Sequence, residues 1–418
     1  MINLMIKVSG RVTGSDHKPL VAQLLFCQGD TQTKIHSRAD GRFRIDLPFG
    51  KYDVEVSKGS EYERLRFSLD ISDYHDALSS IELRKLYTTD WIAGDLHQHS
   101  HYSPDAIDAP YEVVLSNMAA GLRWGAITDH DEVRAAPEFT FEDSRQFTPI
   151  PGVEVTTALG HINALNHETV HDSDVTGLPD IKRILDDVRQ DPDSYLMLNH
   201  PFRSTAAFSH WELYPEFDLI EIWNGRHLSP AHADDYNGIA KAYWFEQLNE
   251  GRYVAAVGGS DNHDVSGYEA VDDLGALSEA EYNRVTQRFS GTPRNYVHTG
   301  EQAVTATSIL DALTAGRSFI TNNPLAYLSI PRANDSATAF PGDTIPAGTH
   351  AVRIQLQSNR SLSGYRLIKN GETVQHEALS GMRLDKQLDL ELVAGDWILL
   401  EAYGTRDDYA ITNPIFVR

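Results

Sequence analysis

The stretch W-I-A-G-D-L-H-Q-H-S-H-Y-S-P-D, from Trp91 to Asp105, is the part of the chain around which the rest is arranged. Its apolar first part is typical of a strand that ends at Asp95-Leu96. His97 and His99 follow at a spacing of two, and side chains with this spacing on an extended chain point to the same face. Asp105 comes on the loop after them. A strand end that carries His-x-His and then a carboxylate predicts the beginning of a metal site.

Other strand ends along the chain carry imidazoles and carboxylates that would complete such a site. With His97, His99 and Asp105, the candidate ligands are His130, Glu154, His161, His200, Asp261 and His263. These nine side chains exceed the needs of one ion with four to six ligands, and they suit two or three ions. A carboxylate has to bridge neighbouring ions, and Glu154 is the natural one. Ions held in this way lower the pKa of a shared water toward about 7 and polarise an oxyanion, as in two-metal hydrolysis.

Between residues 88 and 324 the pattern alternates strands with helices. Helices are expected at Tyr111–Gly121, Pro179–Gln190, Ala233–Gly251 and Ser308–Gly316, the last with Asp311 at the capping-box position. Repeated strand-then-helix units predict a parallel α/β sheet, and this many of them predict a closed barrel. The polar residues gather where strands end, which is the face on which barrel enzymes place their chemistry.

The two flanking segments alternate apolar and polar residues at period two, which predicts β-sandwiches at residues 1–87 and 325–418. Asn370-Gly371 between two extended runs is a strong hairpin signal. In the first segment, G-R-V-T-G followed by D-G-R-F-R-I-D-L-P-F-G-K-Y-D-V-E-V resembles the carboxypeptidase-regulatory-like (transthyretin-like) sandwich. That resemblance implies a structural or binding role, and the expected organisation is three domains.

The composition limits the classes of partner. The chain has 418 residues, and Lys plus Arg 36 against Asp plus Glu 60 gives a net charge of −24, which argues against nucleic acid or an anionic membrane as partner. Cys27 is the only cysteine, so any metal must be held by His, Asp and Glu, which favours zinc, manganese or iron. The sequence has no run of about 18 apolar residues and no signal-peptide pattern at its start. We therefore expect a cytoplasmic protein.

At the ligand positions the sequence resembles the PHP (polymerase and histidinol phosphatase) superfamily. The motifs are D-L-H-Q-H-x3-S-P-D-A, I-T-D-H, G-V-E, G-H, N-H-P and G-S-D-N-H, in that order. Two more, G-H-I-N-A-L and I-E-I-W-N-G, resemble its CehA/McbA-type metallohydrolase branch. The resemblance implies a distorted (β/α)7 barrel with a trinuclear site of zinc, manganese or iron. By position it implies His97, His99, Glu154 and Asp261 for one ion, Glu154, His161 and His200 for the second, and Asp105, His130 and His263 for the third.

A few residues near these motifs are candidates for contacts with substrate. Arg203 and Arg294 are possible anion clamps, because a guanidinium binds a phosphate in bidentate fashion. His200 or His263 would protonate the leaving group if it were not fully committed to a metal. His101 is expected to face substrate or to support a ligand. Four other histidines of this region, at 167, 171, 227 and 232, have no evident partners in the sequence and are interpreted as structural.

The leading hypothesis is a metal-dependent hydrolase, specifically a phosphoesterase acting on a small phosphorylated metabolite or nucleotide through a metal-bridging hydroxide. A carbamate or carboxylic ester hydrolase using the same metals is the alternative enzyme, for which the arginines would matter little. A catalytically silent, metal-stabilised binding protein is the alternative of another class. The sequence carries no G-x-S-x-G elbow and no Walker loop, so serine-hydrolase and kinase chemistry lack support.

Overall fold

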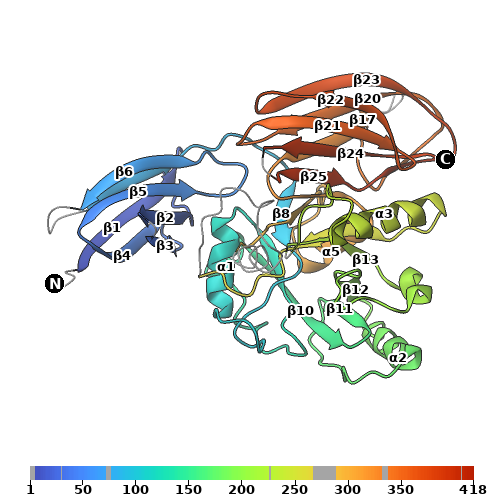
Figure 1. Cartoon of the computed structure of the whole chain (residues 1–418), viewed down its shortest axis with the longest axis horizontal. Helices are drawn as coiled ribbons and strands as arrows, with labels where there is room; N and C mark the ends of the chain where they lie inside the picture. The colour runs from blue at the N-terminus through green and yellow to red at the C-terminus, as the bar shows by residue number, and fades with distance from the viewer. Residues whose placement is uncertain are drawn as a thin grey trace.

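The structure is a computed structural model that describes residues 5–29, 31–71, 77–225, 227–266, 289–331, 338–405 and 407–418. The N-terminal strands lie at one side of the central strands and helices, and the C-terminal strands lie across the top of them (Figure 1). Within the described residues, no helix is long and apolar enough to cross a membrane.

The N-terminal strands β1 to β7 form two sheets, with strand orders β4-β1-β7 and β3-β2-β5-β6. Buried side chains that alternate with exposed ones, such as Val8 on β1 and Val54 on β5, fill a common core between the sheets. The strands are β1 (Met5–Gly14), β2 (Gln23–Gln28), β3 (Thr31–His36), β4 (Arg42–Pro48), β5 (Gly50–Ser57), β6 (Leu65–Ile71) and β7 (Ala77–Leu83).

The central sheet follows the order β14-β13-β12-β11-β10-β9-β8-β15-β16. Most of its strands have four to six residues and are almost entirely buried, as expected where both faces of a sheet are covered. They are β8 (Ile92–Asp95), β9 (Trp124–Ile127), β10 (Thr148–Thr157), β11 (Gly160–Leu165), β12 (Tyr195–Leu198), β13 (Leu219–Asn224), β14 (Ala255–Gly259), β15 (Arg294–Val297) and β16 (Ser318–Thr321).

Antiparallel strands interrupt the parallel arrangement that the sequence predicts: β15 is antiparallel to β8 and β16, and between β8 and β14 the exception is β11. Strands β8, β9 and β10 are mutually parallel, and so are β12, β13 and β14. Strand β11 is antiparallel to both of its neighbours, because the two residues Ala158 and Leu159 turn the chain back in a hairpin. The first residues of β11, and not its last, therefore lie at the edge where the parallel strands end.

At this same edge the segments that follow β8 and β14 are joined. Gln98 and Asn262 form a parallel β-bridge. The backbone N–H of His99 donates to the carbonyl of Asn262 at 3.1 Å, and that of Asp261 donates to the carbonyl of His97 at 2.8 Å. These contacts support our proposal that β8 to β14 close into the distorted barrel that the sequence predicts.

The helices surround the central strands, and their ends follow local sequence signals. They are α1 (Pro110–Ala119), α2 (Leu178–Val188), the 3-10 helix η1 (Trp211–Glu216), α3 (Tyr236–Asn249) and α5 (Ala306–Thr314). Helix α1 begins at Pro110 and is followed by Gly121 at φ +83°, as predicted from the sequence. The capping box of α5 consists of Thr305 and Ser308. The sequence-based placement of Asp311 in that box is wrong, since Asp311 instead accepts a hydrogen bond from Tyr195 at 2.6 Å.

The C-terminal strands continue the central sheet without a break. Strand β25 pairs with β16, and the order then runs through β24 and β21 to β22. A second sheet, β18-β17-β20-β23, packs against this extension around a shared apolar core. Asn370 and Gly371, both at positive φ, form the predicted hairpin turn between β21 and β22. The strands are β17 (Leu325–Pro331), β18 (Thr338–Ala339), β19 (Thr344–Ile345), β20 (Gly348–Gln357), β21 (Leu362–Lys369), β22 (Glu372–Ala378), β23 (Arg383–Leu392), β24 (Trp397–Gly404), β25 (Tyr409–Thr412) and β26 (Ile415–Val417).

Candidate metal centre

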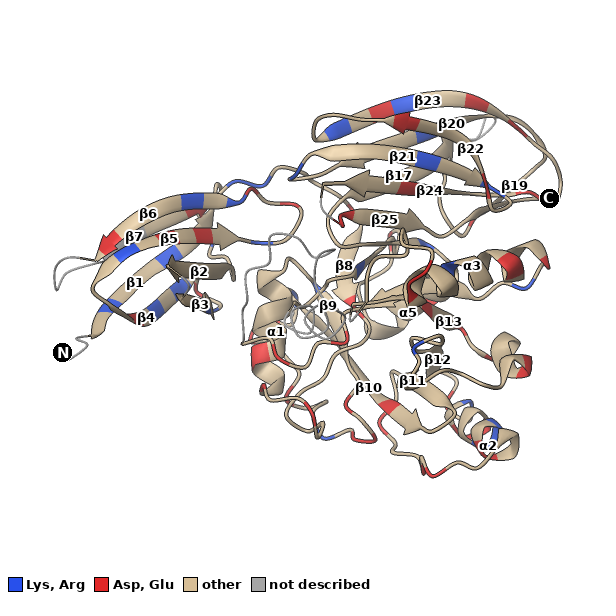
Figure 2. Cartoon of the chain, viewed as in Figure 1, with Lys and Arg blue, Asp and Glu red and all other residues tan. Residues whose placement is uncertain are grey.

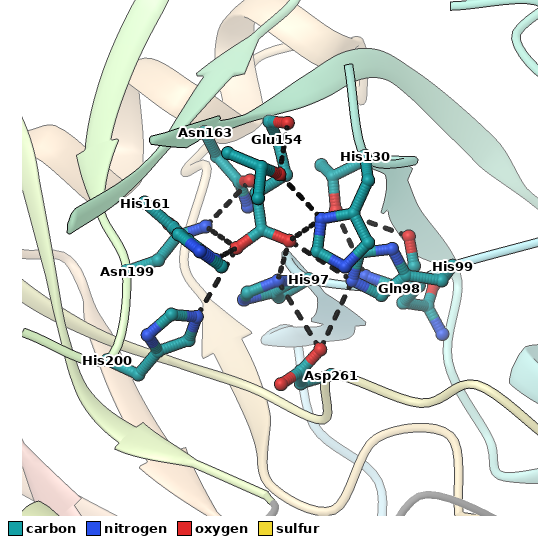
Figure 3. A network of polar contacts seen from close by, with 12 residues as sticks. His97, Gln98, His99, His130, Glu154, His161, Asn163, Asn199, His200 and Asp261 are labelled. Atoms are coloured by element: carbon teal, nitrogen blue, oxygen red, sulfur yellow. Dashed lines mark hydrogen bonds and ion pairs between the residues drawn. The ribbon is translucent and has the colours of Figure 1, made fainter. Parts of the chain in front are cut away.

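The carboxylate of Glu154 lies at the centre of a group of imidazoles (Figure 3). Its Oε2 is 3.0 Å from His130 Nδ1 and 3.3 Å from His97 Nε2. Its Oε1 is 3.0 Å from His161 Nδ1 and 3.3 Å from His200 Nε2. These side chains come from segments up to about a hundred residues apart in the sequence, and the carboxylate is fully buried. Glu154 is therefore positioned to touch more than one cation at once.

A second carboxylate, Asp261, closes the other side of the His97–His99 pair. Its Oδ1 lies 3.1 Å from His99 Nε2 and 3.6 Å from His97 Nε2. Asp261 and His200 both have positive φ, 52° and 26°, although neither is glycine. Backbone held in this region costs about 1–3 kcal/mol, and such strain is concentrated at functional sites. Contacts with the surrounding structure therefore have to compensate for the backbone strain at these two residues.

The remaining candidate ligands form the more exposed side of the same group. Asp105 Oδ2 lies 3.2 Å from His263 Nε2, and its Oδ1 lies 3.7 Å from His130 Nε2. The ring of His99 stacks on His263 with centroids 4.1 Å apart. All nine residues predicted from the sequence are thus in one contiguous group, which we call the Glu154 cluster.

The hairpin of β10 and β11 explains why His161 belongs to the Glu154 cluster. In its register, His161 stands opposite Thr156 and Asn163 stands opposite Glu154, so these side chains share a face. Thr156 Oγ1 lies 2.7 Å from His130 Nδ1, and the amide of Asn199 donates to Glu154 Oε1 at 2.9 Å. The short turn therefore places His161 and Asn163 beside Thr156 and Glu154, at the edge where the parallel strands end.

Buried carboxylates outside the Glu154 cluster orient its imidazoles. Glu221 Oε1 lies 3.1 Å from His97 Nδ1, and its Oε2 accepts the backbone N–H of His200 at 2.8 Å. Asp129 accepts the hydroxyl of Ser103 at 2.9 Å, and the Ser103 oxygen lies 3.0 Å from His99 Nδ1. Sequence reasoning did not assign Glu221 a role. The available signal was a charged residue inside the apolar run Leu219–Trp223, since a fully buried carboxylate requires partners.

The two arginines predicted as anion clamps have different positions. Arg203 Nη1 lies 3.7 Å from Asp261 Oδ2, and its side chain is partly exposed beside the Glu154 cluster. Arg294 is buried, and its guanidinium donates to the carbonyls of Gly291 at 2.8 Å and Ala120 at 2.5 Å. The placement of Arg294 at the site is therefore wrong, because main-chain carbonyls hold its charged end elsewhere. His101 is exposed against Tyr102 and does not join the cluster.

Burial and neighbouring charges favour the ligating form of some groups of the cluster, Glu154 and His200 among them. Burial alone would raise the pKa of Glu154, but His97, His161 and His130 outweigh it and hold that pKa well below its ordinary value. Burial lowers the pKa of His200 to about 3. Metal ligands have to be unprotonated, and these two groups are unprotonated at neutral pH. His97 differs, because Glu154, Glu221 and Asp261 outweigh burial and raise its pKa, a preference that a divalent cation would reverse.

Several buried polar atoms of the cluster indicate that the residues fit a group of cations. Nε2 of His97, His99 and His263 and Oε2 of Glu154 have no hydrogen-bond partner among the described residues. Buried polar atoms normally form hydrogen bonds, so these atoms, which approach one another without forming hydrogen bonds, call for a ligand between them. The cluster and Glu221 together provide four sets of three residues. Within each set, the three ligand atoms lie within 4.8 Å of one another. Imidazole and carboxylate donors without thiolates suit zinc, manganese or iron.

Taken together, the strand order and the Glu154 cluster define an α/β protein with a buried histidine–carboxylate centre suited to divalent metals. Residues 95–218 match the family model of the PHP domain, the family that the sequence motifs resemble. The match includes the cluster residues from His97 to His200, whereas Asp261 and His263 lie beyond it. No curated protein matches the chain.

Solved structures resemble the chain only distantly. A two-domain protein from Bacteroides vulgatus that contains a predicted PHP-like metal-dependent phosphoesterase is 16% identical, with a TM-score of 0.41, over 78% of this chain and 94% of that chain. A protein from Bifidobacterium adolescentis provisionally described as a metal-dependent phosphoesterase is 15% identical, with a TM-score of 0.32, over 47% of this chain and 96% of that chain. An amidohydrolase from Chromobacterium violaceum with bound sulfate and no metal is 18% identical, with a TM-score of 0.28, over 41% of this chain and 87% of that chain.

Proposed function

We propose that the protein is a metal-dependent hydrolase, specifically a phosphoesterase acting on a small phosphorylated ester at a site of two or three divalent ions. The observation that carries the proposal is the fully buried Glu154 carboxylate, which lies within 3.4 Å of imidazoles from several strand ends. Nε2 of His97 and of His99, which approach this carboxylate without forming a hydrogen bond, support the same proposal. A CehA/McbA-type assignment and a cytoplasmic location stay predictions of the sequence.

The proposed ligand sets are those that the sequence resemblance implies. One ion would be held by His97, His99, Glu154 and Asp261, the second by Glu154, His161 and His200, and the third by Asp105, His130 and His263. The proximity of His97, His99 and Asp261 to one another supports the first set. When bound, such ions supply a water of lowered pKa and positive charge beside the leaving oxygen.

The side chains at the edge of the cluster would bind and orient the substrate. Arg203 is the natural group for an anionic oxygen, because its guanidinium is partly exposed next to Asp261. His263 Nδ1 donates to the backbone carbonyl of Asp261 at 2.8 Å, which leaves the lone pair of Nε2 toward the cluster. Burial keeps His200 neutral at pH 7. Both imidazoles are thus better suited to bind a metal ion than to protonate the leaving group, which is the alternative role that the sequence suggests.

Turnover of three model esters by the metal-loaded full chain tests the proposal. We expect hydrolysis of p-nitrophenyl phosphate or bis-p-nitrophenyl phosphate to exceed that of 1-naphthyl N-methylcarbamate. Arg203→Ala should lower kcat/KM for the phosphate ester about 10- to 100-fold, the value of a hydrogen bond between charged groups. Arg353→Ala is the matched control, since Arg353 is exposed and pairs with Asp385 on the C-terminal sheet. An unchanged rate in Arg203→Ala would remove the anion-binding role.

The position of Arg294 keeps the carbamate or carboxylic ester alternative open. With Arg294 bound to main-chain carbonyls, one of the two expected anion clamps is missing from the site. Carbamate turnover without phosphate-ester turnover, and without an effect of Arg203→Ala, would select this alternative. Metal binding with no turnover of any of the three esters would favour the catalytically silent binding protein.

A further inference from the structure

A pair of histidines outside the Glu154 cluster has the geometry of a second metal site. His167 and His171, in the sequence H-E-T-V-H, bring their Nε2 atoms to 2.9 Å from each other. Their rings are stacked, with an angle of 14° between the planes. His167 is buried with 6% of its surface exposed, and His171 is half-buried.

The pair lies at the opposite rim of the central sheet from the Glu154 cluster. His161 is at the first end of β11, and His167 follows the last residue of that strand. An extended strand advances about 3.3 Å per residue, so the two rims are separated by roughly 15–20 Å. Ser194, which directly precedes β12, is on the same rim as His167. The pair is therefore independent of the nine proposed ligands and of the proposed function.

Hydrogen bonds around His167 fix which of its nitrogens is free. Nδ1 lies 3.1 Å from Ser194 Oγ, and that hydroxyl donates to Asp191 Oδ2 at 3.1 Å or to the Asn166 carbonyl at 3.2 Å. When the single hydroxyl hydrogen goes to either of these two acceptors, Ser194 Oγ accepts the proton of His167 Nδ1–H. The lone pair of His167 Nε2 then faces His171. A ligating imidazole whose other N–H is bound in this way is the usual arrangement at metal sites.

The surroundings favour a cation. The pair opens on a cavity of 670 Å³ lined by carboxylates, with Arg183 as its basic residue; the carboxylates are Glu168, Asp172, Asp187 and Asp191. Burial, and then the neighbouring ring of His171, lowers the pKa of His167, and burial lowers the pKa of His171. Both rings are therefore neutral at pH 7, the form that binds metal.

We propose that His167 and His171 bind one divalent transition-metal ion, zinc in the first instance, through their two Nε2 atoms. Zinc lies about 2.1 Å from an imidazole nitrogen, so one ion can contact two nitrogens that are up to about 4 Å apart. The Nε2–Nε2 distance of 2.9 Å is within this limit. Among the described residues no third His, Cys, Asp or Glu donor lies within 4.8 Å of both, so water completes the coordination. H-E-x-x-H binds catalytic zinc when it lies on a helix. Here it lies in an irregular segment, so the ion cross-links the loop after β11, which His167 also joins to Ser194 before β12, and it carries no protease chemistry.

Zinc counting in the full chain tests this site. The protein is stripped with a chelator, dialysed against a small excess of Zn²⁺, and its zinc per chain is measured for wild type, His171→Gln and His210→Gln. The glutamine side chain in His171→Gln has an N–H that can still donate to His167 Nε2. We therefore expect the substitution to remove the metal ligand without disturbing the fold. His210 is a matched control, because it lies next to Glu212 outside both groups.

We expect His171→Gln to bind one zinc ion fewer per chain than wild type and His210→Gln, with ester hydrolysis unchanged. The increase in the unfolding midpoint on adding zinc should also be smaller in His171→Gln. Equal zinc counts in all three proteins would overturn the proposal and leave an ordinary hydrogen bond between two histidines. Loss of several ions or of hydrolysis would also overturn it, because the pair would then be coupled to the Glu154 cluster.

Discussion

Glu221 is a single residue through which the fold acts on the metal centre. Its carboxylate touches His97 and receives the backbone N–H of His200, so it fixes one proposed ligand of each of two ions. Groups of this kind typically change metal affinity or activity 10- to 100-fold when they are replaced. We expect Glu221→Gln to lower metal affinity or kcat/KM within that range, measured by competition with a chelator and by ester turnover.

The control for this prediction is Glu216→Gln, since Glu216 is exposed at the end of η1. It should leave both quantities at their wild-type values. A Glu221→Gln protein that loses thermal stability but keeps its metal affinity would show that Glu221 supports the strand alone.

The positions of some site residues could be predicted from the sequence, and the position of Arg294 could not. His97 and His99 were predictable because they follow an apolar strand, and the ends of such strands meet at one edge. The sequence predicts Glu154 as the last residue of a strand, although β10 continues to Thr157. Arg294 was not predictable. Its burial against the carbonyls of Gly291 and Ala120 depends on how distant segments pack, which no local pattern encodes.

Among the elements, the β10–β11 hairpin has the largest influence on the Glu154 cluster. Its turn ends at Gly160 with φ +126°, and a Cβ added there would lie 2.7 Å from Phe208 Cδ2. Gly160→Ala should therefore destabilise the protein by about 1–3 kcal/mol through strain and overpacking. Because His161 is the next residue, metal affinity should fall as well. Thermal unfolding and chelator competition would measure the two effects.

Gly177→Ala is the matched control for the hairpin. Gly177 has extended backbone, and the nearest atom to an added Cβ is Pro179 Cδ at 3.8 Å. Its stability should change by no more than about 0.5 kcal/mol, as for most surface substitutions. If Gly160→Ala behaved like this control, the hairpin would not be what positions His161.

The same hairpin explains why the sequence predicts the elements better than their directions. Apolar runs and the Pro110 and Gly121 signals locate β8, β9 and α1 correctly. The turn Ala158-Leu159 contains no Asn-Gly or Asp-Gly pair, so nothing local indicates that β11 turns back. In α5, Asp311 and Thr305 both fit capping preferences, and only the position of the first helical turn decides between them.

At the scale of the whole molecule, the negative charge is concentrated in the central segment. Residues 88–324 contain 37 Asp and Glu against 14 Lys and Arg, whereas residues 1–87 contain 12 against 13 (Figure 2). An acidic surround raises the local concentration of cations and opposes highly charged anions. This distribution favours metal uptake by the Glu154 cluster. It also means that an anionic ester depends on Arg203 and on the bound ions for its attraction.

We propose that residues 1–87, 88–324 and 325–418 are three structural units, and the last two share an extensive interface. Strand β25 extends the central sheet through β16. Beside it, Lys241 on α3 donates to Glu401 Oε1 on β24 at 2.8 Å, and the hydroxyl of Tyr409 donates to the same oxygen at 2.7 Å. The pair is almost completely buried, so removing one partner leaves the other uncompensated.

Glu401 therefore predicts how this interface responds to pH. Burial alone would raise the pKa of Glu401, but Lys241 and the hydroxyls of Tyr403 and Tyr409 outweigh it and lower that pKa. A carboxylate with a lowered folded-state pKa contributes stability that is present above its unfolded value, about 4.3, and is lost as the pH falls through the folded value. Glu401→Gln should cost about 3 kcal/mol at pH 7. The difference from wild type in unfolding midpoint should shrink as the pH falls below about 4.

The exposed ion pair of Arg353 and Asp385 is the control that shows how much of the Glu401 effect is due to burial. Their atoms approach to 2.6 Å, yet each side chain is about half exposed. Asp385→Asn should change stability by less than about 1 kcal/mol, because water and salt screen such a pair. If Glu401→Gln and Asp385→Asn had equal effects at pH 7, or if the Glu401→Gln difference stayed constant well below pH 4, the buried charge would not be what holds α3 to the C-terminal strands. The interface would then depend on the continuous sheet and its apolar core alone.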